Sequence, residues 1–221
     1  MVVLHYTGMP TGTAALERLC DPTAKVSAHW FIDEDGTVTA LVDEGRRAWH
    51  AGVGSWQRAT DLNTRSIGIE LVNPGHDWGY RDFPARQMAA LRDLLAGIVA
   101  RHGIPRGRIL GHSDVAPLRK QDPGERFDWA SLAGAGYGLW PAPDYAPSPN
   151  APALGPGQSG PAVLNLQIAL DAIGYGIEGT GLYDPVTEQV VTAFQRHFRQ
   201  SGVDGVADPE TTSLIHHLAT R

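Results

Sequence analysis

The apolar positions in the first 140 residues fall into short runs separated by turn residues. Residues 1–7 form a nearly continuous apolar run, which is typical of a strand buried on both faces. The sequence Asp33-Glu34-Asp35-Gly36 is typical of a hairpin turn between two β-rich runs. Strands are therefore expected over residues 1–7, 28–33, 37–42, 66–72 and 108–111.

One stretch has a clear helical period. Within residues 83–102, apolar side chains recur at three- and four-residue spacing from Met88 to Ile98, and Gly103 supplies a C-terminal stop. A shorter helix is expected over residues 14–19. Strands that alternate with one long helix predict an α/β domain, with a mixed central β-sheet flanked by helices.

The composition changes after residue 140. Seven of the 16 prolines lie from Pro141 to Pro161, which predicts a semi-rigid linker without regular structure over residues 141–161. An amphipathic helix is expected over residues 162–173. Two later Asp-Pro pairs each place a capping Asp before a proline at the first helical position. We therefore expect residues 162–221 to form a small three-helix, all-α domain.

Charge and cysteine content narrow the function classes. The formal net charge of -6 argues against nucleic acid or an anionic membrane as a partner. No run approaches the ~18 apolar residues of a membrane span, so no membrane insertion is expected. The start of the chain lacks the features of a signal peptide, which favours a cytoplasmic protein; a periplasmic or secreted one is the alternative if a leader was removed. Cys20 is the only cysteine, and we expect it to be a small buried apolar side chain.

The segment from Gly111 to Gly124 combines an imidazole, an ammonium and a carboxylate directly after an expected strand. Its two prolines fix φ locally and favour a loop over a helix. His112 and Asp122 are ligand types that suit zinc, and a catalytic zinc needs three protein ligands and one open position. The third ligand has to come from elsewhere, and His5 on the first strand is the best candidate. The sequence therefore predicts a Zn²⁺ site.

Five motifs occur in an order that matches a known family: LHYTGM, SAHWFIDEDG, RAWHAG, NTRSIGIELVN and GHSDVAPLRKQDPG. Residues 1–140 thereby resemble the zinc-dependent N-acetylmuramoyl-L-alanine amidases of the type-2 group, relatives of the peptidoglycan recognition proteins. The C-terminal part is similar to the peptidoglycan-binding type 1 module, on Leu166-Gln167, Gly174-Tyr175 and Phe194-Gln195.

The resemblance and the residue chemistry together imply roles in catalysis. A zinc held by His5, His112 and Asp122 would activate water. Glu70 projects from a strand among isoleucines, which suits a proton shuttle, and Lys120 is placed to stabilise the oxyanion. Asp114 is expected to cap the loop or support a ligand rather than to replace Asp122 as one.

Other polar residues in these motifs are candidates for substrate binding, with structural or solvated roles as alternatives for the histidines and arginines. These candidates are His29, Arg47, Trp49, His50 and Arg119. The remaining histidines have no supporting context and are expected at the surface or at helix ends: His76, His102, His197, His216 and His217.

The predicted reaction is hydrolysis of the amide between N-acetylmuramic acid, including 1,6-anhydro forms, and L-alanine of the stem peptide, in peptidoglycan turnover or recycling. The expected partners are muropeptides or glycan strands, and we expect a monomer. The alternatives are an exported wall-lytic autolysin or endolysin of the same chemistry, a non-catalytic peptidoglycan receptor, and a metallohydrolase of an unrelated amide.

Overall fold

The computed structural model describes residues 1–220, and contacts divide the chain into two compact units. The first unit comprises Met1–Val53, Asp61–His112 and Asp122–Leu139. The second comprises Gly54–Thr60, Ser113–Gln121 and the chain from Trp140 onward. Because this division follows contacts and not chain order, the boundaries expected at residues 140 and 161 remain a prediction.

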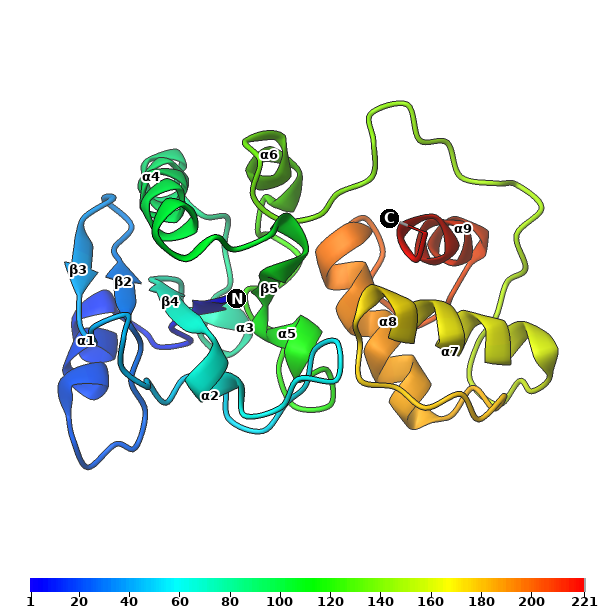
Figure 1. The fold of residues 1–221 in the computed structure, drawn as a ribbon, viewed down its shortest axis with the longest axis horizontal. Helices are drawn as coiled ribbons and strands as arrows, with labels where there is room; N and C mark the ends of the chain where they lie inside the picture. Colours follow the sequence, from blue (N-terminus) through cyan, green and yellow to red (C-terminus); the bar gives the residue numbers. More distant parts are fainter. Residues whose placement is uncertain (221) are drawn as a thin grey trace. The chain divides into compact units, whose positions relative to one another are not determined.

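The first unit is built on a five-stranded mixed sheet in the order β3-β2-β4-β1-β5 (Figure 1). β1 runs parallel to β4 and β5, β2 runs parallel to β4, and only β3 is antiparallel to its neighbour. The predicted α/β fold class and all five expected strands are confirmed. The strands are β1 (Val2–Tyr6), β2 (Trp30–Ile32), β3 (Val38–Ala40), β4 (Ile67–Leu71) and β5 (Ile109–Gly111).

The strand register places chemically active residues in one row. His5 on β1 is the register partner of Glu70 on β4. Leu4 pairs with Gly111, so His112, which directly follows β5, comes level with His5. Register partners in a sheet point to the same face, and clefts of such sheets lie at the carboxyl ends of the strands. His5, Glu70 and His112 therefore lie together at the carboxyl ends of their strands.

Two helices flank the sheet (Figure 1). α1 (Gly12–Cys20) begins after Thr11, whose side chain accepts the Ala14 N–H, and it buries Ala15 against Phe31. α4 (Ala85–His102) is the expected long helix, with the apolar residues from Met88 to Ile98 on its buried face. Shorter helical segments are α2 (Leu62–Arg65), α3 (Gly75–Trp78), η1 (Arg106–Arg108), α5 (His112–Val115) and α6 (Trp129–Gly134).

Two expectations about local structure were wrong. The segment after Gly111 is not entirely loop: it begins with one helical turn, α5, and only the later part is irregular, because its first proline comes after that turn. Cys20 is exposed. It lies five positions after Ala15, about 140° around the helix from the buried face.

Gln87 fastens α4 to the sheet. Its side chain is fully buried, and Nε2 donates to the carbonyls of Ile32 and Val72, each at 3.0 Å. Gln87→Met keeps the volume but leaves both carbonyls without this donor. We expect a loss of about 2 kcal/mol in the free energy of unfolding, measured by urea denaturation. Ala96→Met, at an exposed position of the same helix, should change it by less than about 0.5 kcal/mol. Equal stability of the two variants would contradict this role.

The second unit contains three longer helices: α7 (Pro161–Ile173), α8 (Pro185–Phe198) and α9 (Pro209–Leu218). The Asp184 and Asp208 side chains accept the N–H groups of Thr187 and Thr211, each at 2.8 Å, as the Asp-Pro pairs predicted. The helices bury Leu166, Val190, Phe194 and Ile215. The expected three-helix fold of the C-terminal part is confirmed.

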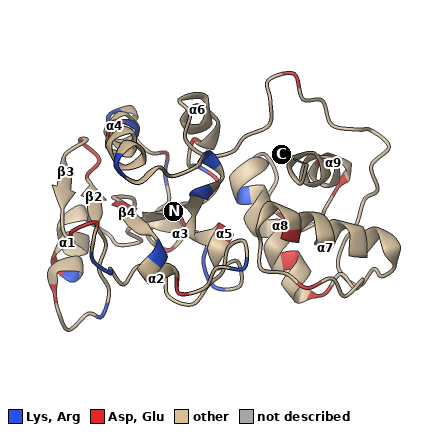
Figure 2. Ribbon diagram, in the orientation of Figure 1, with Lys and Arg blue, Asp and Glu red and all other residues tan. Residues whose placement is uncertain are grey.

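Charges of opposite sign are interspersed in the first unit (Figure 2). Glu44, for example, accepts hydrogen bonds from Arg101, at 2.7 Å, and from Trp30 and His102. These contacts, the Arg101 bond most of all, lower the pKa of Glu44 to about 2. Within residues 1–220, no helix is long and apolar enough to span a lipid bilayer.

Candidate metal centre

Three predicted ligands converge in the first unit. His5 Nδ1 lies 2.9 Å from His112 Nδ1 and 2.9 Å from Asp122 Oδ2, and the latter two atoms are 3.0 Å apart. Their residues are 2%, 3% and 6% exposed. Among the described residues, this is the group of ligand-type side chains that could hold a metal ion. Two imidazoles and one carboxylate are a donor set that fits zinc.

The surroundings favour the ionised form of Asp122. Burial by itself raises the pKa of this carboxyl, but the adjacent side chains of His112 and His5 outweigh burial and hold the pKa below its usual range. The next residue is also fixed, since the Tyr80 hydroxyl donates to the Pro123 carbonyl at 2.7 Å. An ionised, anchored carboxylate is the form that ligates a metal.

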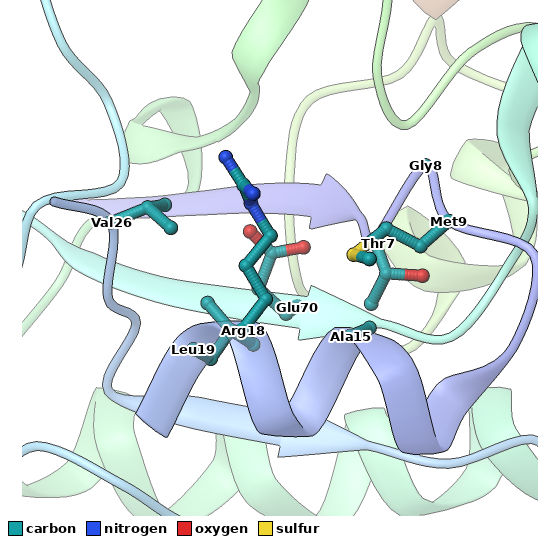
Figure 3. Close-up of a pocket in the computed structure, with 8 residues that line it drawn as sticks. All are labelled: Thr7, Gly8, Met9, Ala15, Arg18, Leu19, Val26 and Glu70. Atoms are coloured by element: carbon teal, nitrogen blue, oxygen red, sulfur yellow. The ribbon is translucent and has the colours of Figure 1, made fainter. Parts of the chain in front are cut away.

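Glu70 lines a cavity of about 310 Å³ beside this row of the sheet (Figure 3). Its carboxylate and the Arg18 guanidinium reach into the same space, from β4 and from α1. The isoleucines that the sequence placed around Glu70 are not its apolar surroundings, because Ile67 and Ile69 alternate with it along the strand. The apolar lining instead comes from Met9, Ala15, Leu19 and Val26.

Two histidines proposed for substrate binding are buried. His29 is 1% exposed; its Nε2 lies 3.0 Å from the Arg46 carbonyl, and its Nδ1 accepts the Gly68 N–H at 2.9 Å. His50 is 7% exposed, and its Nδ1 lies 3.0 Å from His5 Nε2. Burial lowers the pKa of both rings, that of His50 well below its ordinary value. These contacts favour the structural alternative for both residues.

Trp49 and Arg47 are accessible. Trp49 is 55% exposed, and the Arg47 guanidinium lies 4.2 Å from its ring centroid. Arg47 also pairs with Asp61 at 3.0 Å. Trp49 lines a second cavity of about 400 Å³, which shares Leu19 and Val26 with the cavity beside Glu70. An exposed aromatic face of this kind can bind a substrate ring.

Two further predicted residues, Arg119 and Lys120, lie on a segment that belongs to the second unit. Arg119 is exposed, and Lys120 is half-buried. Their roles remain predictions.

Asp114 does not join the metal cluster. It lies in the second unit, fully buried, where it accepts the Tyr175 hydroxyl at 2.8 Å and contacts His197 Nδ1 at 2.7 Å. His197 lies in the last turn of α8, at a helix end as expected, but it is only 2% exposed and is therefore not a surface residue. The hydrophobic pattern of α8 did not predict the burial of His197, because its partner Asp114 lies 83 residues away in the chain.

Comparison with known proteins identifies the family. Residues 1–125 match the N-acetylmuramoyl-L-alanine amidase family, and residues 159–215 match a peptidoglycan binding domain family. The chain is 34% identical to the N-acetylmuramoyl-L-alanine amidase AmiD of Escherichia coli, over 99% of this chain and 81% of AmiD. The chain belongs to the N-acetylmuramoyl-L-alanine amidase family, and the prediction of an amidase with a peptidoglycan-binding module is confirmed.

Solved structures agree with this assignment. AmiD in complex with anhydro-N-acetylmuramic acid-L-Ala-D-γ-Glu-L-Lys matches with a TM-score of 0.84 and 32% identity, over 100% of this chain and 88% of that chain. AMPDH3 of Pseudomonas aeruginosa also matches with a TM-score of 0.84, at 31% identity, over 100% and 91%. The 1,6-anhydro-N-acetylmuramyl-L-alanine amidase AmpD of Citrobacter freundii is 36% identical over 59% of this chain and 76% of AmpD.

Proposed function

We propose that this protein is a zinc-dependent enzyme that hydrolyses the amide between N-acetylmuramic acid and L-alanine of the stem peptide. The observation that carries the proposal is the buried convergence of His5, His112 and Asp122 at the carboxyl ends of the strands, beside the Glu70 cavity. The AmiD complex supports anhydro-muropeptides as the substrate class. The proposed role is the turnover or recycling of such fragments by a monomer.

The proposed mechanism assigns three roles to side chains. His5, His112 and Asp122 would hold zinc, which when bound would act as a Lewis acid toward a carbonyl and would make water reactive near neutral pH. Glu70 accepts the proton of the attacking water and returns it to the departing L-alanine nitrogen. The Lys120 ammonium stabilises the negative charge on the carbonyl oxygen in the transition state.

Substrate positioning is assigned to exposed residues. Trp49 offers a ring face to the sugar or peptide, with Arg47 stacked on it. Arg119 is suited to a carboxylate of the stem peptide. The peptidoglycan-binding module raises the local concentration of its polymer near the enzyme. His29 and His50 take structural roles in this proposal.

The direct test is product analysis by mass spectrometry. Zinc-loaded protein is incubated with a muramoyl tripeptide, its 1,6-anhydro form and intact sacculi. We expect free peptide that begins with L-alanine, and faster cleavage of the soluble fragments than of sacculi. Preference for sacculi would favour the wall-lytic alternative. Binding of all three without cleavage, with zinc present, would contradict the proposal and favour a receptor.

A further inference from the structure

We infer that the segment His50-Ala51 is the support that makes Nδ1 the metal-binding atom of both histidine ligands, and that His50 is therefore a positioning residue for His5. The inference rests on the proposed metal centre and concerns the residues that form hydrogen bonds with its two histidine ligands. Each ligand imidazole presents Nδ1 to the cluster, so its Nε2 must carry the proton in the neutral ring. The hydrogen-bond acceptors of these two Nε2–H groups therefore determine whether each Nδ1 has a lone pair available for a metal ion.

The proton on His5 is fixed by a chain of hydrogen bonds that begins at a backbone carbonyl. The Ser66 hydroxyl donates to the Leu62 carbonyl, so its oxygen faces His50 Nε2, at 3.3 Å, as an acceptor. His50 Nε2 therefore carries the proton, and its Nδ1 has a lone pair. That lone pair accepts from His5 Nε2 at 3.0 Å, which leaves a lone pair on His5 Nδ1.

The proton on His112 is fixed by the adjacent residue. His112 Nε2 lies 2.9 Å from the Ala51 carbonyl, which can only accept. The neutral ring therefore donates from Nε2 and presents the Nδ1 lone pair to the cluster. Partners of this kind orient metal-bound histidines and increase their basicity. The dipeptide His50-Ala51 thus accepts a hydrogen bond from each ligand: the His50 side chain accepts from His5, and the Ala51 carbonyl accepts from His112.

The dipeptide is itself held in place. Asn63 Oδ1 accepts the N–H of His50 at 3.0 Å and that of Ala51 at 2.8 Å, and Asn63 is only 6% exposed. The sheet also leaves room for the His50 ring. A Cβ added to Gly68 on β4 would lie 2.4 Å from His50 Cγ, so glycine is required there for the ring to lie beside His5.

Burial excludes a direct role in substrate contact for His50. The residue is 7% exposed, and both of its ring nitrogens face protein atoms, His5 Nε2 and Ser66 Oγ. Its effect on the reaction therefore passes through His5.

The test is the zinc affinity of variants, measured by competition with a fluorescent zinc chelator. His50→Leu removes the acceptor at similar volume and is expected to raise the zinc Kd about 10- to 100-fold. His50→Asn, whose amide oxygen can replace Nδ1, should stay within about fivefold of the parent. The matched control is His102→Leu, on the exposed end of α4, with unchanged affinity. Asn63→Ala should weaken zinc binding with His50 intact.

A second readout does not depend on zinc. Long-range ¹H–¹⁵N spectra of the metal-free protein, at about pH 8.5 where imidazoles are neutral, report histidine tautomers. We expect the Nε2–H form for His5, His50 and His112, and a mixture at His5 in Ser66→Ala. The inference is overturned if His5 carries its proton on Nδ1, or if His50→Leu binds zinc as tightly as the parent. A parent protein that binds no zinc would instead overturn the proposed function, and the inference with it.

Discussion

Asp122→Ala is expected to abolish hydrolysis and to release the metal. The substitution removes the one anionic ligand and leaves two neutral imidazoles, which are too few to hold a catalytic zinc. Metal activation is worth several kcal/mol of transition-state stabilisation, so kcat/KM should fall at least about a thousandfold. Zinc content after dialysis should fall to background, measured by elemental analysis.

Its control is Asp93→Ala, which removes an exposed carboxylate on α4. That variant should keep both full zinc content and full activity. An Asp122→Ala protein that is folded, by circular dichroism, and still cleaves the substrate would contradict the assignment of Asp122 as a ligand.

Glu70→Gln is expected to separate proton transfer from metal binding. Glu70 is in register with His5 but contributes no atom to the converging group. An amide of the same shape cannot accept the proton, so kcat should fall about 10²- to 10⁴-fold, while the zinc Kd and KM change little. The measurements are steady-state kinetics on a soluble muropeptide and the chelator competition.

The exposed Glu17→Gln on α1 serves as the control and should leave kcat unchanged. Loss of zinc from the Glu70 variant would assign Glu70 to the metal site, and unchanged kcat would remove it from the mechanism. Together, the Asp122 and Glu70 variants distinguish the residues that hold the metal from the one that moves the proton.

The sequence predicted these two groups for identifiable reasons. Histidines and carboxylates at the ends of apolar runs can be recognised as possible metal ligands from their side-chain chemistry. Parallel strands bring their carboxyl ends together. His5 and His112 could thus be paired although 107 residues separate them. The long helix α4 was predictable because its period extends over several turns.

The supporting residues could not be predicted in this way. Ala51 acts through its carbonyl, and Asn63 and Ser66 each act through more than one hydrogen-bond contact in a region with no hydrophobic period. The membership of residues 54–60 and 113–121 in the second unit depends on contacts between distant parts of the chain, which no local pattern records. The substrate-binding roles of Arg47, Trp49 and Arg119 remain predictions for the same reason.

The most direct test of the metal centre is a zinc titration of the metal-free protein, with bound zinc and amide hydrolysis measured in the same samples. We predict that the rate of L-alanyl peptide release rises in proportion to bound zinc and reaches its maximum at one zinc per chain. Hydrolysis at full rate by protein that holds almost no zinc, or one bound zinc per chain with no hydrolysis of any muropeptide, would contradict the account.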